Sequence, residues 1–313
     1  MNFFDFHCDT ICECFNQNKS LLNNDLHIDL IRSKQELQNY CQTFAVWIPD
    51  DKRGIIALDY FNSVYDCFIK EINNNLNLIS FCKSSEDISS TFKNNKIAAL
   101  LSVEGGAVLG GNINNLYDIY NKGVRLMTLT WNGQNELGCG CMCDDPGGLT
   151  DFGKSVVKEM QKLGMIVDVS HLSEKGFYDV VKITDKPFIA THSNCKIVEN
   201  QWAQKRNLSD EQIKTLVERR CAVGINLCAD FLGDNGNTGK EAVLRHINHF
   251  LELGAENILC FGADFDGCTV NCELSGIDKI YVIYDYLLSK GFSQDLINKI
   301  FFDNARRFII ANI

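Results

Sequence analysis

Several histidines in this sequence directly follow apolar runs of the length of a β-strand. His171 ends a run that begins at Ile166, and His192 ends a second run that begins at Phe188. Neutral imidazole is the commonest metal ligand that protein side chains supply. If the two runs are neighbouring parallel strands, their carboxyl ends bring both rings to the same mouth of the sheet.

Other apolar runs end in further side chains that can bind metal or transfer protons. His7 and Asp9 are two residues apart, a spacing that places both side chains on one face of a strand. Glu104 lies inside Ser-Val-Glu-Gly-Gly, and Asp264 lies inside Gly-Ala-Asp-Phe-Asp-Gly. Imidazoles and carboxylates together suit one or two divalent ions such as Zn²⁺. Two ions need a bridging carboxylate, for which Glu104 is the candidate, and a hydroxide between them would be a nucleophile at neutral pH.

Each of these residues also has an ordinary structural explanation. A single histidine at a strand end is more often part of a hydrogen-bonded structure than a metal ligand. An aspartate in that position is frequently the cap of the next helix. Six such residues at the same end of one sheet are much harder to explain as caps, so the sequence favours a metal centre.

The elements that must position these residues alternate between strand-like and helix-like patterns. Helices are predicted between the strands, for example at residues 57–74, 150–163 and 240–253. Strands separated by helices predict a parallel sheet with right-handed crossovers. Their number and the chain length favour a (β/α)8 TIM barrel, with a doubly wound open sheet as the alternative. The eight predicted strands are residues 3–9, 42–48, 97–103, 124–130, 165–170, 188–191, 221–227 and 258–263.

Composition restricts the classes of protein to which the chain can belong. With 313 residues, 45% of them hydrophobic, and no linker rich in glycine, serine or proline, one domain spanning residues 1–313 is expected. A net charge of −10 without a long basic cluster argues against a nucleic-acid partner. No apolar run reaches the length of a membrane span, and the first residues do not resemble a signal peptide. We therefore expect a cytoplasmic protein without a membrane partner, whose 15 cysteines are reduced.

With these residues assembled, the sequence resembles the membrane dipeptidase (renal dipeptidase) family of zinc peptidases, within the amidohydrolase superfamily. The resemblance covers nearly the whole chain. Its motifs are residues 5–9 (DFHCD), 102–106 (SVEGG), 123–130 (GVRLMTLT), 149–153 (LTDFG), 164–171 (GMIVDVSH), 191–193 (THS), 205–207 (KRN) and 262–267 (GADFDG).

The resemblance implies a (β/α)8 barrel that holds two zinc ions and hydrolyses dipeptides. By position, His7 and Asp9 would hold one zinc, His171 and His192 would hold the other, and Glu104 would bridge them. Asp264 would be the general base and acid, in preference to Asp266 of the same motif. Arg206 would bind the C-terminal carboxylate of the dipeptide. The family's tolerance of a C-terminal D-residue makes L,D-dipeptides candidate substrates, and the resemblance also suggests a homodimer.

Two positions depart from the family pattern: Phe6, where glycine is usual, is expected to serve packing, and the other bears on the substrate. Several family members have a histidine directly after the Thr-Leu-Thr run, where it contacts the scissile carbonyl, whereas this sequence has Trp131. Indole can donate one hydrogen bond but carries no charge. Either Asn132 or Asn135 replaces the histidine as donor, or zinc alone polarises the carbonyl, and we expect Trp131 and Asn132 to contact the substrate. The Cys139-Gly-Cys-Met-Cys143 stretch lacks the four ligands of a structural zinc site, and free thiols on a substrate loop are expected.

Three functions remain open from the sequence. The first is a zinc-dependent dipeptidase. The second is a binuclear metal amidohydrolase that acts on another amide, a lactam or an ester, which the tryptophan at position 131 motivates. The third is a binding protein that has kept the barrel without catalysis.

Overall fold

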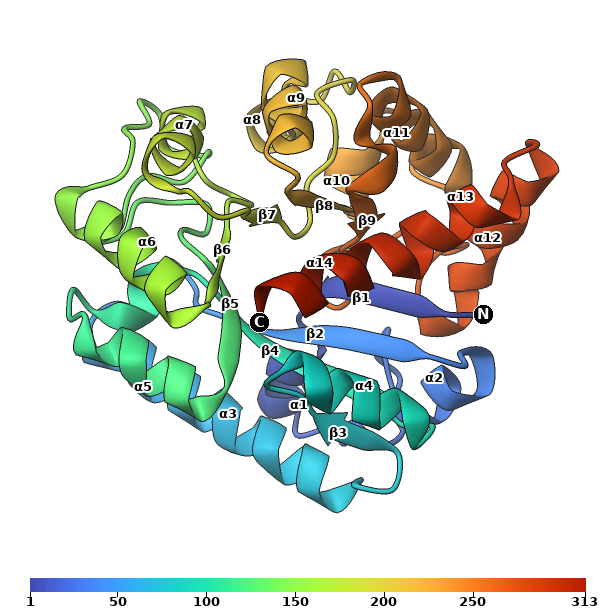
Figure 1. The fold of residues 1–313 in the computed structure, drawn as a ribbon, viewed down its shortest axis with the longest axis horizontal. Helices are drawn as coiled ribbons and strands as arrows, with labels where there is room; N and C mark the ends of the chain where they lie inside the picture. Colours follow the sequence, from blue (N-terminus) through green and yellow to red (C-terminus); the bar gives the residue numbers. More distant parts are fainter.

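A closed ring of parallel strands forms the centre of the computed structural model, which describes residues 1–313 (Figure 1). The ring runs in the order β2, β1, β9, β8, β7, β6, β5, β4 and back to β2. The strands are β1 (Phe3–Cys8), β2 (Tyr40–Trp47), β3 (Ile79–Phe81), β4 (Ile97–Glu104), β5 (Val124–Thr128), β6 (Ile166–Asp168), β7 (Ile189–Ala190), β8 (Ala222–Ile225) and β9 (Leu259–Phe261).

The pairing of β2 with β4 closes the barrel. It runs from Cys41 opposite Ala98 to Trp47 opposite Glu104. The remaining strand, β3, pairs only with residues 97–99 of β4. From residue 101 onward, the same edge of β4 pairs with β5. Strand β3 therefore lies outside the ring, and the predicted barrel of eight strands is confirmed.

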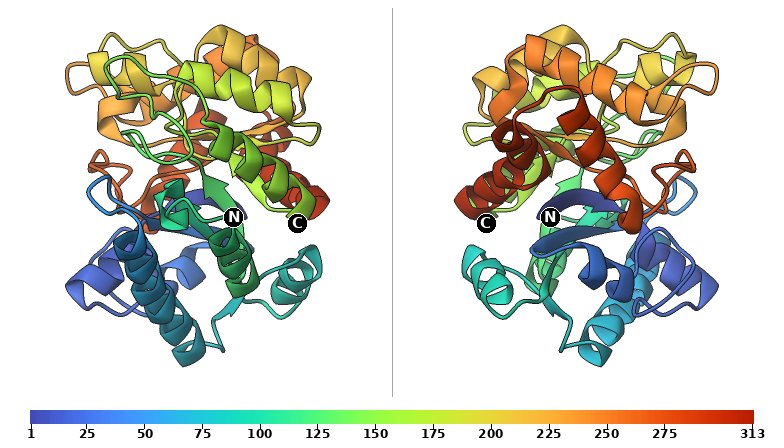
Figure 2. Two further views of the ribbon diagram at one scale, coloured as in Figure 1. Left: turned by 90° about the vertical axis from the view of Figure 1, so that its left-hand side faces the viewer. Right: turned by 90° about the vertical axis from the view of Figure 1, so that its right-hand side faces the viewer.

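Helices surround the barrel on its outer face (Figures 1 and 2). Short 3₁₀ segments are η1 (Gly106–Leu109), η2 (Ala255–Asn257) and η3 (Ile277–Lys279), and a π-helical turn, η4 (Lys299–Asp303), precedes the last helix. The α-helices are α1 (Thr10–Gln17), α2 (Leu30–Glu36), α3 (Ile55–Asn74), α4 (Ser85–Lys93), α5 (Asn114–Lys122), α6 (Asp151–Leu163), α7 (Glu174–Ile183), α8 (Gln201–Arg206), α9 (Asp210–Glu218), α10 (Ala229–Leu232), α11 (Lys240–Glu252), α12 (Ile280–Ser289), α13 (Gln294–Asn298) and α14 (Asn304–Asn312).

Local chemistry explains where the predicted helices begin and end. The side chains of Ser84 and Ser209 form capping boxes at the starts of α4 and α9. Thr150 caps α6 by accepting a hydrogen bond from the backbone N–H of Gly153. At the other end of α6, Gly164 takes a left-handed conformation with φ of 76°, which glycine adopts without strain.

The C-terminal helix closes the amino end of the barrel. A buried cluster takes at least one side chain from every strand of the ring, and Phe302, Phe308 and Ile309 complete it. The ring of Phe308 packs edge-on against Phe6 of β1, with 6.3 Å between ring centres. In Figure 1 this red helix lies across the barrel. The opposite end of the barrel, where the strands terminate, carries the residues predicted to do chemistry. No helix has both the length and the apolar character needed to cross a lipid bilayer.

His246, on α11, gives the fold a dependence on pH. Its ring is buried, accepts a hydrogen bond from the N–H of Cys195 through Nδ1 and contacts the carbonyl of Leu232 through Nε2. Burial lowers its pKa to about 4 from the usual 6.5. As the pH falls from 6.5 towards 4, His246 is therefore protonated in the unfolded chain but stays neutral in the native state. We expect this residue to contribute up to about 3 kcal/mol above pH 6.5, lost progressively as the pH falls.

Urea unfolding of the metal-free protein at about pH 7 and about pH 5 measures this contribution. The variant His246→Asn keeps hydrogen-bonding groups but does not titrate, so it should lose less stability between the two pH values than the wild type. If both proteins lost the same free energy of unfolding between the two pH values, groups other than His246 would be responsible for the acid sensitivity.

Candidate active site

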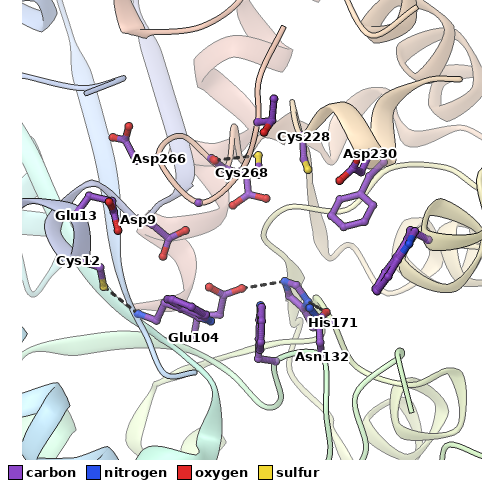
Figure 3. A pocket seen from close by; sticks show the side chains of 17 residues that line it. Asp9, Cys12, Glu13, Glu104, Asn132, His171, Cys228, Asp230, Asp266 and Cys268 are labelled. Atoms are coloured by element: carbon purple, nitrogen blue, oxygen red, sulfur yellow. Dashed lines mark hydrogen bonds and ion pairs between the residues drawn. The ribbon is translucent and has the colours of Figure 1, made fainter. Parts of the chain in front are cut away.

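A cavity of about 500 Å³ opens at the carboxyl ends of the barrel strands (Figure 3). Many of the residues predicted from the sequence line it, while His7 and His192 are buried beneath it. The predicted residues in its wall are Asp9, Glu104, Trp131, Asn132, His171 and Asp264.

The candidate metal ligands form two groups around Glu104, and the first group is built around His7, near the end of β1. Its Nε2 lies 3.4 Å from Oδ2 of Asp9 and 3.5 Å from Oε2 of Glu104. Asp9 occupies the position of a helix cap before α1, but its side chain makes no capping hydrogen bond. The carboxylate is therefore free to face His7 and the cavity.

The other group is built around the two histidines that follow β6 and β7. Oε1 of Glu104 lies 2.9 Å from Nε2 of His171 and 3.3 Å from Nε2 of His192 (Figure 3 shows the first contact). The two Nε2 atoms are 3.0 Å apart. Each oxygen of Glu104 thus faces a different set of ligand atoms, which is the arrangement that a bridging carboxylate requires.

Hydrogen bonds behind the rings hold these nitrogens in place. Nδ1 of His171 contacts Oδ1 of Asn132 at 2.9 Å, and Nδ1 of His192 contacts the hydroxyl of Thr191 at 2.7 Å. That hydroxyl donates to Asp168 at 2.6 Å, so its oxygen accepts from His192. Because the Nδ1 atoms carry the protons, both Nε2 lone pairs point at Glu104. Such partners raise the basicity of metal-ligating histidines.

The chemistry of this set fits a metal centre. Nε2 of His7 and Oδ1 of Asp9 are buried without any hydrogen-bond partner, which is costly unless a ligand satisfies them. Burial raises the pKa of Asp9 to about 7 despite its contact with His7. Burial also acts to raise the pKa of Glu104, but the neighbouring charge of His7 holds that pKa well below its usual range. Buried carboxylates and neutral imidazoles in contact are a ligand set for divalent cations.

Gly267 leaves room for these carboxylates. A Cβ at this position would lie 2.2 Å from Oδ2 of Asp9 and 2.7 Å from Oδ1 of Asp264. We expect Gly267→Ala to displace both groups and to weaken metal binding about 10- to 100-fold, the range seen when ligand orientation is disturbed. Metal affinity by competition with a chelator measures the effect. In the matched control, Gly147→Ala, the nearest atom is 3.4 Å from the new Cβ, and unchanged affinity is expected. Equal affinities in both variants would contradict the prediction.

Asp264 and Asp266 have different surroundings. Oδ2 of Asp264 accepts a hydrogen bond from Nδ2 of Asn226 at 2.8 Å, while Oδ1 faces Nε2 of His7 at 3.8 Å. Both oxygens of Asp266 are used, by the hydroxyl of Thr10 and by the backbone N–H of His27. His171, Asp264 and Asp266 have φ of 63°, 62° and 68°, a conformation uncommon outside glycine. Asp264 is therefore the carboxylate that remains available for chemistry.

Arg206 is a buried cation at the end of α8. It is 4% exposed, and no carboxylate forms an ion pair with it. Nη1 donates to the hydroxyl of Ser193 at 2.9 Å and Nη2 donates to the carbonyl of His192 at 2.7 Å, while Nε has no partner. Arg206 lies behind the wall of the cavity, 5.6 Å from the ring centre of Phe231, which lines it. A buried guanidinium without a counter-ion is suited to an anionic ligand.

A profile of the membrane dipeptidase family (Peptidase family M19) matches residues 1–311. This chain belongs to the membrane dipeptidase family. The resemblance to this family that the sequence motifs indicate is therefore confirmed.

Individual proteins are similar to this chain in sequence or in fold. An uncharacterized protein in the pqqA 5′ region of Klebsiella pneumoniae is 30% identical over 245 residues, which cover 75% of this chain and 89% of that protein. The fold matches a metallopeptidase from Rhodobacter sphaeroides, crystallised with a phosphinate mimic of the dipeptide L-Ala-D-Ala, with a TM-score of 0.92 at 23% identity. That match covers 100% of this chain and 99% of the other. The probable dipeptidase PvdM from Pseudomonas aeruginosa gives 0.87 at 18% identity, covering 100% and 96%.

The second position at which this dipeptidase-family member departs from the pattern lies in the wall of the cavity. Trp131 packs edge-on against Trp47, with 5.1 Å between ring centres. The side-chain oxygen of Asn132 is occupied by His171, and the amide of Asn135 is used by backbone groups of its own loop. Asn135 is therefore unsuited to the substrate contact considered from the sequence, and Asn132 also orients a histidine.

The loop that carries Cys139, Cys141 and Cys143 supports the site through its backbone. The N–H of Cys141 donates to the carbonyl of His171 at 2.7 Å, and the carbonyl of Cys139 accepts from the N–H of Ser173 at 3.0 Å. All three cysteines are free thiols. The loop thus fixes the backbone around His171.

Sequence reasoning missed the residues that support the centre. Asp168 accepts hydrogen bonds from the hydroxyls of Thr128 and Thr191, each at 2.6 Å, and so ties β5 to the end of β7. An acidic residue inside a buried apolar run was a usable indication of this role. Asn226 and Trp47 carry no comparable pattern.

Proposed function

We propose that this protein is a zinc-dependent dipeptidase that hydrolyses the peptide bond of free dipeptides, including those with a C-terminal D-residue. The observation that carries the proposal is the position of Glu104, with one oxygen towards His171 and His192 and the other towards His7. Family membership supports the reaction, and the L-Ala-D-Ala mimic bound by the Rhodobacter relative supports the substrate class.

In this proposal His7 and Asp9 would hold one zinc ion, His171 and His192 would hold the other, and Glu104 would be shared between them. Nitrogen and carboxylate ligands in this mixture suit zinc. When bound, such a pair supplies Lewis acidity towards the peptide carbonyl and a hydroxide nucleophile at neutral pH.

Asp264 moves the proton. Its Oδ2 is fixed by Asn226, and its Oδ1 faces the centre, so the carboxylate can accept a proton from the attacking water. The same oxygen then returns the proton to the leaving amine. Because the carboxylate is held from behind, it stays oriented through both transfers.

Arg206 binds the free C-terminal carboxylate of the dipeptide. A guanidinium has five N–H donors, and Ser193 and His192 occupy two of them. The remaining donors, including the unpartnered Nε, can receive a carboxylate in a bidentate pair. Trp131 and Trp47, with Asn132 beside them, line the cavity itself and would contact the rest of the substrate.

The test of this function compares a dipeptide with its C-terminal amide. Arg206→Lys keeps the charge but loses the bidentate geometry. We expect kcat/KM for L-Ala-D-Ala and L-Ala-L-Ala to fall about 10- to 100-fold, since one charged hydrogen bond is worth about 1.5–3 kcal/mol. Hydrolysis of the dipeptide amide should be poor in the wild type and unchanged by the substitution.

Thermal unfolding of both proteins controls for damage to the fold. If the substitution lowered kcat/KM equally for the dipeptide and for its amide, Arg206 would not bind the substrate carboxylate. No hydrolysis of any dipeptide by the zinc-loaded wild type would overturn the proposal.

A second candidate is a binuclear amidohydrolase that acts on another amide, a lactam or an ester. The observation that favours it is the uncharged indole of Trp131 in the cavity wall, where several family members have a histidine. A substrate of this kind without a carboxylate would be hydrolysed equally by the wild type and by Arg206→Lys.

A further inference from the structure

Two thiols share the catalytic cavity with Asp264. Cys228 and Cys268 both line it, and Figure 3 shows their sulfur atoms on the same side of the cavity. The two Sγ atoms and one carboxylate oxygen of Asp264 all lie within 4.8 Å of one another. Neither cysteine has a part in the proposed hydrolysis.

The backbone holds the two cysteines in register. Cys228 follows β8 and lies at the start of α10, and Cys268 lies in the turn after β9. Cys228 is bridged to Val270, and the N–H of Ala229 donates to the carbonyl of Thr269 at 2.9 Å. Two short segments that are about 40 residues apart in the sequence are thus fastened side by side.

Asn226 connects the thiols to the carboxylate. Its Oδ1 accepts from the N–H of Cys228 at 2.6 Å, and its Nδ2 donates to Asp264 at 2.8 Å. The thiol of Cys268 donates to the backbone carbonyl of Asp264 at 3.4 Å. The three candidate ligands are therefore positioned before any cation arrives, which reduces the cost of assembling a site.

We propose that Cys228, Cys268 and Asp264 form a separate binding site for a thiophilic divalent cation, such as Cd²⁺ or excess Zn²⁺, and that its occupation inhibits the enzyme. Two thiolates and one carboxylate, with a fourth position open to the cavity, match the coordination of such ions. Each thiol releases its proton to solvent when it binds the cation.

This site differs from the histidine and carboxylate centre in the softness of its ligands. The centre built around Glu104 contains no sulfur ligand, so a thiophilic cation should bind more tightly to the cysteine pair. The cation would inhibit hydrolysis because a carboxylate that coordinates it can no longer accept a proton, and Asp264 is the proposed proton acceptor. This second half of the inference rests on the proposed role of Asp264, whereas cation binding does not.

Cadmium titration of the reduced, zinc-loaded holoenzyme tests the binding. A phosphine reductant keeps the thiols reduced without competing for the metal. We expect one equivalent of Cd²⁺ beyond the resident metal, accompanied by ultraviolet absorbance from thiolate-to-cadmium charge transfer. The double variant Cys228→Ser, Cys268→Ser should lose both the extra equivalent and the absorbance.

The matched control replaces the half-exposed Cys143 and the exposed Cys272, two thiols outside this cluster, by serine. This variant should keep the wild-type signal. No charge-transfer absorbance in the wild type, or equal absorbance in the wild type and in the cluster variant, would overturn the site. If the double variant fails to fold, the absence of charge-transfer absorbance in the wild type would still overturn the site.

A second measurement tests inhibition. The cadmium concentration that halves dipeptide hydrolysis should be at least tenfold higher for Cys268→Ser than for the wild type. Cadmium absorbance together with equal inhibition of both proteins would overturn the inhibitory role. Failure of the protein to hydrolyse dipeptides would overturn the proposed function but would leave the absorbance result standing.

Discussion

Replacing Glu104 by glutamine is expected to abolish most hydrolysis and to lower the metal content of the purified protein. The two oxygens of Glu104 face different groups of ligand atoms, and the amide keeps only one acceptor and no negative charge. A metal pair supplies several kcal/mol of transition-state stabilisation, so kcat should fall roughly 10³-fold or more. Elemental analysis and kcat on a dipeptide, measured on the same preparation, check both parts.

Glu13 provides the control for this substitution. Its carboxylate lines the same cavity and accepts hydrogen bonds from Asn16 and Gln17, but it contacts none of the proposed ligands. Glu13→Gln should keep its metal and most of its rate. A Glu104→Gln protein with full metal content and the wild-type rate would refute the bridging role.

Replacing Asp264 by asparagine is expected to lower kcat about 10²- to 10⁴-fold, the range for removal of a general acid–base group. The metal content should stay unchanged, because Asp264 lies 3.8 Å from Nε2 of His7 and outside the proposed ligand set. Asparagine keeps the size and the contact with Asn226 but cannot accept and return a proton. Steady-state kinetics with elemental analysis separate loss of proton transfer from loss of metal.

Asp266→Asn is the matched comparison two residues away. Both oxygens of Asp266 are already used by Thr10 and His27, so its replacement should lower stability by about 1–3 kcal/mol with a small effect on kcat. Urea unfolding and kcat on both variants distinguish the two roles. A larger fall in kcat for Asp266→Asn than for Asp264→Asn would show that Asp266, and not Asp264, transfers the proton.

The strands of the ring could be predicted from the sequence because each is a buried apolar run of sufficient length. The prediction failed for β3, whose Ile-Ser-Phe segment is only partly buried and lies outside the ring. It also missed α1, where threonine and two cysteines lower the helical propensity although Ile11 and Cys12 are buried. Strand ends were overestimated before His171, where the backbone leaves the sheet and takes a positive φ.

The clustering of the candidate metal ligands could be predicted because a parallel barrel brings all its strand ends to one rim. His7, Glu104 and His192 are far apart in the sequence, yet the topology alone brings them together. The contacts that orient them could not be predicted in this way. The bond from Thr191 to Asp168, for example, depends on rotamers and on the register between strands, which no spacing in the sequence specifies.

The positive φ angles of His171, Asp264 and Asp266 have an evolutionary consequence. Holding a non-glycine residue in this region costs on the order of 1 kcal/mol or more at each position. At Asp266 the hydrogen bonds from Thr10 and His27 offset this cost, whereas at His171 and Asp264 selection for thermal stability alone would favour glycine. Their side chains survive only under a counteracting demand, so lineages in which the activity has lapsed should lose these residues early.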